Sequence, residues 1–222
     1  MWSSDAELFG LIRTKLFTAV IGDILDELGF VHQFLPPVIR PLRDDMVVVG
    51  RALPVLAQDL ADAGDPARPF GAMLDALDDL KPGEVYLASG GSVSAYAMWG
   101  ELMSTRARAL GAAGAVLNGC SRDTRGILAM DFPVFSAARY AQDQRGRGTV
   151  VDFRLPIQIG AVLVEPGDIL FGDIDGVLAI PRTAEREALT RALEKVDKEN
   201  LVREAIAGGM SAADAFALHG VL

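Results

Sequence analysis

The chain has 222 residues, of which half are hydrophobic and 23% are charged, so it can bury a core and is not expected to be disordered. Its formal net charge of −9 argues against a nucleic-acid partner, because a nucleic-acid backbone requires a basic surface. With one cysteine, no signal-peptide pattern and no run of 18 apolar residues, we expect a cytoplasmic protein without a membrane partner.

The mean hydropathy of +0.27 is high for a soluble monomer of this length. Apolar surface that one core does not hide commonly forms a subunit interface. We therefore expect a homo-oligomer.

The start of the chain predicts two amphipathic helices, over residues 5–16 and 18–28, with Thr18 capping the second and Gly29 ending it. Asp23 and Asp26 share a helical face, which we interpret as an exposed, solvated one. Later strands are expected at residues 46–56, 84–88, 115–118, 132–135, 149–153, 157–160, 162–164, 169–171 and 177–180. Later helices are expected at residues 70–80, 101–110 and 183–207, with Thr183 as a cap, and after Ser211.

Residues 84–118 read as strand, helix and strand, which predicts a parallel strand pair joined by a right-handed crossover. The turn at residues 89–92 contains two glycines but lacks the lysine and spacing of a phosphate-binding loop. We predict an α/β fold in one domain over residues 1–222. Its core covers about residues 15–185, and a helical tail covers about residues 183–222.

The stretch from Trp99 to Asp123 carries charged side chains at both ends. Glu101 opens its predicted helix, and Arg122 and Asp123 lie in the loop predicted at residues 119–123 after its short strand. If helix and strand pack antiparallel, the chain returns and these two ends meet. The stretch is therefore the candidate functional site.

Other chemistries have little support in the sequence. His32 and His219 lack metal-ligand partners at suitable spacing, which argues against a histidine zinc site and a catalytic triad. Cys120 has no partner base, and we interpret it as a small buried residue. None of the four lysines lies in an apolar strand, so a Schiff-base mechanism is not expected.

Carboxylates and arginines are left as the candidate groups. A hard cation such as Mg²⁺ prefers oxygen ligands and keeps several waters, so one or two carboxylates can hold it. Arg122 offers a planar fork for a substrate carboxylate or an enolate oxygen, and a helix that begins near Gly100 offers unpaired N–H groups. From spacing alone, a turn with a local Arg122–Asp123 ion pair is the commoner explanation.

The same residues resemble the RraA-like proteins, which include the class II 4-hydroxy-4-methyl-2-oxoglutarate aldolases. The resemblance runs in consistent order over residues 15–185. Its motifs are G-E-L-M at 100–103, G-A-A-G-A-V at 111–116, Gly119 with Arg122-Asp123, F-P-V-F at 132–135, V-E-P-G-D at 164–168 and G-D-I-D-G-V at 172–177.

The resemblance implies a compact α/β/β/α fold like the swivelling phosphohistidine domain, assembled as a homotrimer or homohexamer with sites near subunit interfaces. It implies that the backbone of Gly100, Glu101, Leu102 and Met103 binds the carboxylate of a 2-oxo acid. Arg122 would bind the oxo acid and steady its enolate. Asp123 would hold a divalent metal, Mg²⁺ or Mn²⁺, partly through water.

Two departures from the family pattern affect this assignment. Aldolases of the family carry an acid, usually Asp, twenty-one positions before the arginine, where this chain has Glu101. That residue is assigned as a positioner of water or a neighbour of the metal. Thr124-Arg125-Gly126 replaces acidic residues that many relatives carry, which leaves the substrate preference open.

The leading hypothesis is a metal-dependent lyase that cleaves a 4-hydroxy-2-oxo acid to pyruvate and decarboxylates oxaloacetate. Both reactions pass through the same enolate, which Arg122 would stabilise, with a water positioned by Glu101 or Asp123 transferring the proton. The alternative is a non-catalytic regulator that binds an RNA-processing enzyme. A third possibility, methyl transfer, finds no glycine-rich cofactor loop in the sequence.

Overall fold

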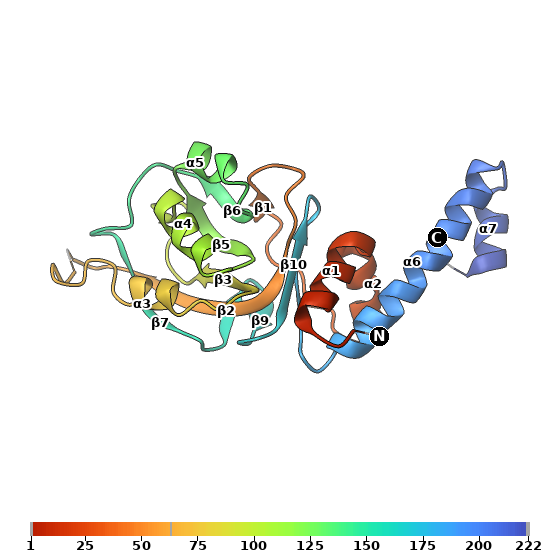
Figure 1. Ribbon diagram of the computed structural model, residues 1–222, viewed down its shortest axis with the longest axis horizontal. Helices are drawn as coiled ribbons and strands as arrows, with labels where there is room; N and C mark the ends of the chain where they lie inside the picture. Colours follow the sequence, from red (N-terminus) through yellow and green to blue (C-terminus); the bar gives the residue numbers. More distant parts are fainter. Residues whose placement is uncertain (1, 63, 221–222) are drawn as a thin grey trace.

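The fold is built around one nine-stranded mixed sheet in the computed structural model, which describes residues 2–62 and 64–220 (Figure 1). Strand β2 (Val48–Asp59) is central and pairs in parallel with β3 (Glu84–Ser89). On the opposite edge, β2 pairs antiparallel with β10 (Ile169–Asp173) over its first half. Over its second half, that edge pairs with β7 (Gly148–Phe153).

The remaining strands extend the sheet on both sides of β2. Its order is β1-β6-β5-β3-β2-β10-β11, and β4 joins it by pairing with β5. These strands are β1 (Arg40–Pro41), β4 (Ala97–Trp99), β5 (Gly114–Ser121), β6 (Val134–Arg139) and β11 (Gly176–Ile180). The parallel pairing of β3 with β5 was predicted and is confirmed. A separate hairpin consists of β8 (Ile157–Ile159) and β9 (Val162–Val164).

The two ends of the sheet approach each other, so the sheet is close to a closed barrel. Arg40 of β1 donates from Nη1 to the carbonyl of Ile174, between β10 and β11, at 3.0 Å. Just before β1, the amide of Leu35 donates to the carbonyl of Val177 at 2.9 Å. These bonds satisfy polar groups that an open sheet edge would leave unpaired.

Helices cover both faces of the sheet and create two hydrophobic cores. The outer core lies under α1 (Asp5–Lys15), α2 (Thr18–Glu27) and the start of α6 (Glu185–Ala207). The other core lies under α3 (Met73–Asp78), α4 (Glu101–Ala109) and α5 (Thr124–Ala129). Figure 1 shows α6 running away from the sheet and ending beside α7 (Ala212–His219). No helix in residues 2–62 and 64–220 is long and apolar enough to cross a membrane.

Strand β11 shows why the hydrophobic runs of this sequence are continuous. Its residues Val177 and Ala179 lie in the α3–α5 core, whereas Leu178 and Ile180 lie in the outer core. A strand that is buried on both faces has no polar side to alternate with. The sheet therefore needs helices on both faces, as the α/β prediction requires.

Several predicted boundaries are corrected by the structure. The helix predicted at residues 70–80 is shorter, and the strand predicted at 115–118 is the longer β5. Part of the loop predicted at residues 119–123 therefore belongs to β5. Strands β1 and β4 and helix α5 were not predicted. Strand β4 has three residues and exists through its pairing with the end of β5, a long-range contact that local patterns do not reveal.

The prediction that Thr18 caps the second helix is wrong. Phe17 is the N-cap, and Thr18 is the first residue of α2. The Asp173 carboxylate caps this helix from the β10–β11 turn, accepting bonds from the backbone N–H and the hydroxyl of Thr18, both at 2.8 Å. The same carboxylate accepts a bond from the amide of Asp175 at 2.9 Å. One aspartate therefore fixes a turn and ties α2 to the sheet.

Other predictions about helix ends have mixed outcomes. The prediction that Thr183 caps α6 is wrong, because Ala184 is the N-cap and no side chain caps that end. The cap assigned to Ser211 is confirmed, since its hydroxyl accepts a bond from the backbone of α7. Asp23 is exposed, as predicted, and forms an ion pair with Lys195 of α6 at 2.6 Å.

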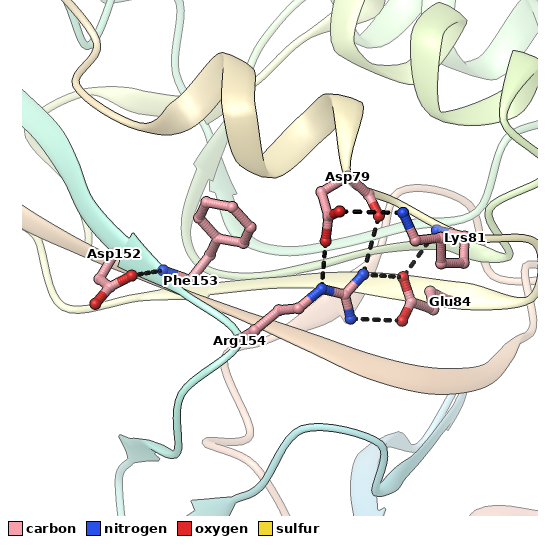
Figure 2. Close-up of polar contacts among 6 residues, drawn as sticks. All are labelled: Asp79, Lys81, Glu84, Asp152, Phe153 and Arg154. Carbon is pink, nitrogen blue, oxygen red and sulfur yellow. Dashed lines mark hydrogen bonds and ion pairs between the residues drawn. The ribbon is translucent and has the colours of Figure 1, made fainter.

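A charged network around Arg154 holds α3 against the sheet (Figure 2). Arg154 follows β7 and has a left-handed backbone conformation, with φ of 58°. Its guanidinium lies between two carboxylates and donates to both. It donates to both oxygens of Glu84 at 2.8 and 3.0 Å. It also donates to the side chain of Asp79 and, at 2.9 Å, to the carbonyl of that residue at the end of α3. Lys81 pairs with Asp79 at 3.0 Å.

We predict that Asp173→Ala lowers the free energy of unfolding by about 1–2 kcal/mol, because it removes the cap of α2. Urea denaturation followed by circular dichroism measures this change. Asp175→Ala is the matched control, since Asp175 is exposed in the same turn, and its effect should stay within about 0.5 kcal/mol. Equal losses in the two variants would contradict the assignment of the cap.

We predict that Arg154→Met lowers the free energy of unfolding by about 1 kcal/mol at pH 7. This value is the upper end of the stabilisation that exposed ion pairs usually contribute. The Arg154 guanidinium, followed by Lys81, holds the pKa of Asp79 below its usual value. The contribution of Asp79 is therefore present above its unfolded pKa of about 3.9 and is lost as the pH falls through the lower folded pKa.

The difference between wild type and Arg154→Met should accordingly shrink below about pH 4, as urea denaturation at several pH values can show. Arg68→Met is the control, because it breaks an exposed ion pair with Asp75 of the same helix and should have little effect. A difference for Arg154→Met that is constant from pH 3 to pH 7 would contradict the electrostatic explanation.

Candidate functional site

The two ends of the Trp99–Asp123 stretch meet because β4 and β5 are adjacent parallel strands. Ala97 pairs with Cys120 and Trp99 with Ser121, and the amide of Arg122 donates to the carbonyl of Trp99 at 2.9 Å. Both strands thus end at the same edge of the sheet, where α4 and α5 begin. The carboxyl ends of parallel strands are the usual location of ligand sites in α/β proteins.

Asp123 takes an uncommon backbone conformation at this edge. Its φ of 57° and ψ of 30° place it in the left-handed region, which Asp tolerates better than most residues. Asp123 is the N-cap of α5, yet its side chain makes no capping bond to that helix. The carboxylate turns instead toward the start of α4, where Oδ2 accepts from the amide of Glu101 at 3.4 Å.

Gly100 is required by this approach of Asp123. A Cβ at position 100 would lie 2.6 Å from Asp123 Oδ2 and 3.4 Å from Arg122 Cγ. Gly100 is also the N-cap of α4, so the amides of Glu101, Leu102 and Met103 have no carbonyl partner within the helix. Unpaired N–H groups and the positive end of the helix dipole favour an anion here.

Arg122 lies between two carboxylates without being hydrogen-bonded to either. Its Nε is 3.7 Å from Asp123 Oδ2, and its Nη1 is 3.5 Å from Asp143 Oδ1. Both contacts are longer than the 2.7–3.2 Å of ordinary N–H···O bonds. In the part of the chain that the structure describes, the guanidinium makes no side-chain hydrogen bond. Its donors are therefore available to a ligand.

Glu101 is brought to the same edge, but its carboxylate lies to one side. It packs on Gly126 in the first turn of α5, where a Cβ would lie 2.3 Å from Glu101 Cδ. Glu101 is exposed and does not line the cavity described below. The structure thus joins Arg122 and Asp123 to the start of α4, while the Glu101 side chain points onto α5.

Two site residues, Asp143 and Gln144, were not found from the sequence. They belong to the loop between β6 and β7, which the amide of Ala97 holds by donating to the carbonyl of Gln142 at 2.8 Å. Gln144 is only 3% exposed, yet its Nε2 has no hydrogen-bond partner among the described residues. Such an orphaned donor is uncommon in folded proteins. In the sequence, Asp143 and Gln144 were recognisable only as part of a polar loop.

These residues surround a cavity of about 360 Å³. Arg122, Asp123, Asp143 and Gln144 supply its polar lining, together with the backbone at Gly100. The remaining lining comes from β4, from the segment that contains α3 and from the first turn of α4. These residues are Phe70, Met73, Leu74, Leu77, Ala97, Met98, Trp99, Leu102 and Met103. The cavity therefore combines one cation, two carboxylates and an extensive apolar wall.

The donor set suits a cation that retains most of its water. Within residues 2–62 and 64–220, no three His, Cys, Asp or Glu side chains gather as a metal cage. Asp123 and Asp143 line the same cavity, and both are partly exposed, so each can offer a hard oxygen ligand while water fills other positions. This arrangement fits Mg²⁺ or Mn²⁺ better than Zn²⁺, which is usually bound by three or four protein side chains, mostly Cys and His.

The interpretation of Cys120 as a small buried residue is confirmed. Cys120 is buried, and burial raises the pKa of its thiol, so it is not an activated nucleophile. His32 is exposed in its loop, and neither it nor His219 belongs to a metal-ligand group among the described residues.

Comparisons with known proteins identify relatives of this sequence and of its fold. The sequence matches the RraA-like family model (Aldolase/RraA) over residues 18–179. A Halalkalibacterium halodurans protein, provisionally named 4-hydroxy-4-methyl-2-oxoglutarate aldolase, is 31% identical over 214 residues, 96% of each chain. A solved structure of an uncharacterized Pseudomonas syringae pv. tomato protein is 25% identical, with a TM-score of 0.83 over 97% of this chain and 99% of its own.

A further solved structure extends the comparison of fold. Streptomyces coelicolor RraAS2, described as an unusual member of the RNase ES inhibitor RraA family, has a TM-score of 0.80 at 21% identity. The match covers 91% of this chain and 99% of that one. At this identity the likeness concerns the fold alone.

Proposed function

This chain belongs to the RraA-like family, and from that premise we propose that it is a lyase that releases pyruvate from a 4-hydroxy-2-oxo acid. One observation carries the proposal: Arg122 and Asp123 meet the N-terminus of α4, whose first amides have no carbonyl partner within the helix, at the polar end of a cavity. The 31% identical relative, whose name is that of an aldolase, supports the same class of reaction. Decarboxylation of oxaloacetate is the expected second activity.

The substrate's carboxylate is proposed to accept hydrogen bonds from the first amides of α4, at Leu102 and Met103. Those amides are unpaired within the helix, and the helix dipole adds to their attraction for an anion. Arg122 then donates to the 2-oxo group with guanidinium N–H groups that make no hydrogen bond to a side chain among the described residues. Two contacts of this kind orient the substrate before the bond breaks.

A divalent cation, Mg²⁺ or Mn²⁺, is proposed to be held by Asp123, with water and Asp143 completing its surroundings. When bound, it would supply Lewis-acid polarisation of the 2-oxo group. The uncommon backbone of Asp123 serves this role, because it directs the carboxylate into the cavity and away from capping α5. Backbone strain of this kind is characteristic of functional sites.

The reaction breaks the C3–C4 bond of the 4-hydroxy-2-oxo acid. The C4 hydroxyl loses its proton and becomes a carbonyl, and the bonding electrons pass to the enolate of pyruvate. Arg122 stabilises the developing charge on the C2 oxygen. A water held by the carboxylate of Asp123 takes the hydroxyl proton, and C3 is then protonated to give pyruvate. Oxaloacetate yields the same enolate when CO₂ leaves.

Gln144 is assigned a role in binding the substrate. Its amide nitrogen is buried beside the cavity without a partner, which ordinarily costs about 1–3 kcal/mol. A substrate oxygen that accepts this bond would remove the penalty. Gln144 thus adds to Arg122 a second polar contact, one that the sequence did not reveal.

Assembly as a trimer or hexamer and a cytoplasmic location stay predictions. The alternative role, a non-catalytic regulator of an RNA-processing enzyme, is supported only by likeness of fold to RraA proteins. It becomes the better account if the purified protein releases no pyruvate from any acid tested below.

We predict that Arg122→Ala and Asp123→Asn each lower kcat/KM by about 100-fold or more. The first removes the guanidinium that stabilises the enolate, and the second removes the carboxylate proposed to hold the metal. Pyruvate release from 4-hydroxy-4-methyl-2-oxoglutarate and oxaloacetate, coupled to lactate dehydrogenase, measures the change. EDTA should abolish release, and added Mg²⁺ or Mn²⁺ should restore it.

Arg125→Ala is the matched control for Arg122→Ala. Arg125 is exposed on α5 and does not line the cavity, so the variant should keep the wild-type rate. Circular dichroism checks that every variant is folded. Wild-type turnover by Arg122→Ala and Asp123→Asn would refute the site, and full activity in EDTA would refute the metal.

For Gln144→Met we predict a KM about tenfold higher and a free energy of unfolding that is unchanged or up to about 1 kcal/mol greater, because an unpaired buried amide is removed. Steady-state kinetics and urea denaturation separate the two effects. Gln158→Met, at an exposed position on β8, is the control. A loss of stability with an unchanged KM would mean that Gln144 is only structural.

A further inference from the structure

The apolar wall of the cavity is more extensive than the binding of pyruvate requires. Met73, Leu74 and Leu77 of α3 line the cavity, and Phe70 precedes them. Met73 and Leu77 are buried, whereas Leu74 is 56% exposed. This wall lies beside the first turn of α4, because α3 and α4 pack against each other (Figure 1).

Leu102 forms the facing part of this wall and is 84% exposed. A single exposed leucine needs no explanation, but two from different helices that line one cavity form an apolar surface suited to a ligand. The amide of Leu102 belongs to the proposed carboxylate site, so the polar contact and the apolar surface adjoin at one residue.

Charge limits what can occupy this wall. Arg122 is the only lysine or arginine among the residues that line the cavity, and Asp123 and Asp143 lie beside it. A substrate with one carboxylate can place it on α4 and its 2-oxo group on Arg122. A second carboxylate would lie against leucine and methionine side chains or beside the two aspartates, and no second cation lines the cavity to pair with it.

We propose that the preferred substrate is a 4-hydroxy-2-oxo acid with a single carboxylate and an apolar alkyl or aryl substituent on C4. The inference rests on the proposed lyase function and specifies its substrate class. The balance of the reaction is unchanged: the C3–C4 bond breaks, the hydroxyl proton leaves and the C4 fragment departs as an apolar aldehyde. The electron pair forms the enolate that is protonated to pyruvate.

The apolar substituent is expected to contribute through burial. Each buried methylene raises kcat/KM by about fourfold, until the substituent fills the wall. The ratio of kcat/KM between an apolar substrate and its dicarboxylic analogue should exceed this fourfold factor. The analogue loses the apolar contact with the wall and also places a charge beside it.

The experiment compares pyruvate release from two sets of acids with the whole purified protein and Mg²⁺. One set carries methyl, ethyl, propyl or phenyl on C4 of 4-hydroxy-2-oxobutanoate. The other is 4-hydroxy-2-oxoglutarate and its 4-methyl derivative. We expect kcat/KM to rise along the alkyl series and to exceed that of the dicarboxylic acids by at least tenfold.

Two variants test the wall itself. Leu74→Arg places a cation on α3 facing the cavity and should shift the ratio of kcat/KM values at least tenfold toward the dicarboxylic acids. Leu163→Arg is the matched control, because Leu163 is 54% exposed on β9 and lies outside the cavity lining. It should leave the ratio unchanged.

The possible failures are distinguishable. If wild type cleaves the dicarboxylic acids as well as or better than the apolar acids, the substrate class is wrong while the lyase function stands. If no acid releases pyruvate, the lyase function is wrong. Calorimetry still tests the wall in that case, because 2-oxo-4-phenylbutanoate should bind at least tenfold more tightly than 2-oxoglutarate. Equal affinities, or tighter binding of 2-oxoglutarate, would overturn the inference about the cavity.

Discussion

The close approach of the Asp123 carboxylate to Gly100 is the constraint on which the site depends. It requires a residue without a side chain at position 100, since a Cβ there would lie 2.6 Å from Asp123 Oδ2. It also requires Asp123 to adopt φ of 57°, which directs its carboxylate to α4. The parallel pairing of β4 with β5 supplies the register that makes both possible. Strand pairing, a glycine and one strained residue thus act together.

The sequence was sufficient for the family and the α/β fold, and it also predicted that the two ends of the Trp99–Asp123 stretch meet. The family model and the solved relatives confirm the first two. This meeting was predictable because Gly100, Arg122 and Asp123 lie at the ends of one helix and one strand, and short-range patterns identify such ends. The two ends meet in the structure as expected. The chemical roles of these residues stay predictions.

Features created by contacts between distant segments were not predictable. Strand β4 has only three residues and no pattern of its own, so neither it nor the extension of β5 could be recognised locally. Asp143 and Gln144 reach the cavity because their loop bonds to Ala97 of β4. Thr18 illustrates the same limit: its position suggested a cap, whereas the cap comes from Asp173, 155 residues away. A single sequence does not show which distant carboxylate will lie at the start of a given helix.

The local Arg122–Asp123 ion pair that spacing suggested is present in the structure, but its geometry differs from that of other arginine pairs in the chain. Arg154 donates to both carboxylate oxygens of Glu84 at 2.8 and 3.0 Å, and Arg51 donates to both of Asp5 at 2.6 and 2.8 Å. Both guanidinium groups therefore hydrogen-bond to protein acceptors. Arg122 lies 3.5 and 3.7 Å from its two carboxylates and makes no such bond among the described residues. A partly exposed pair at that separation contributes about 0–1 kcal/mol, too little to explain a strained Asp123 beside it. A fork whose donors are unfilled, next to unpaired helix amides, is instead the arrangement that recognises an anion.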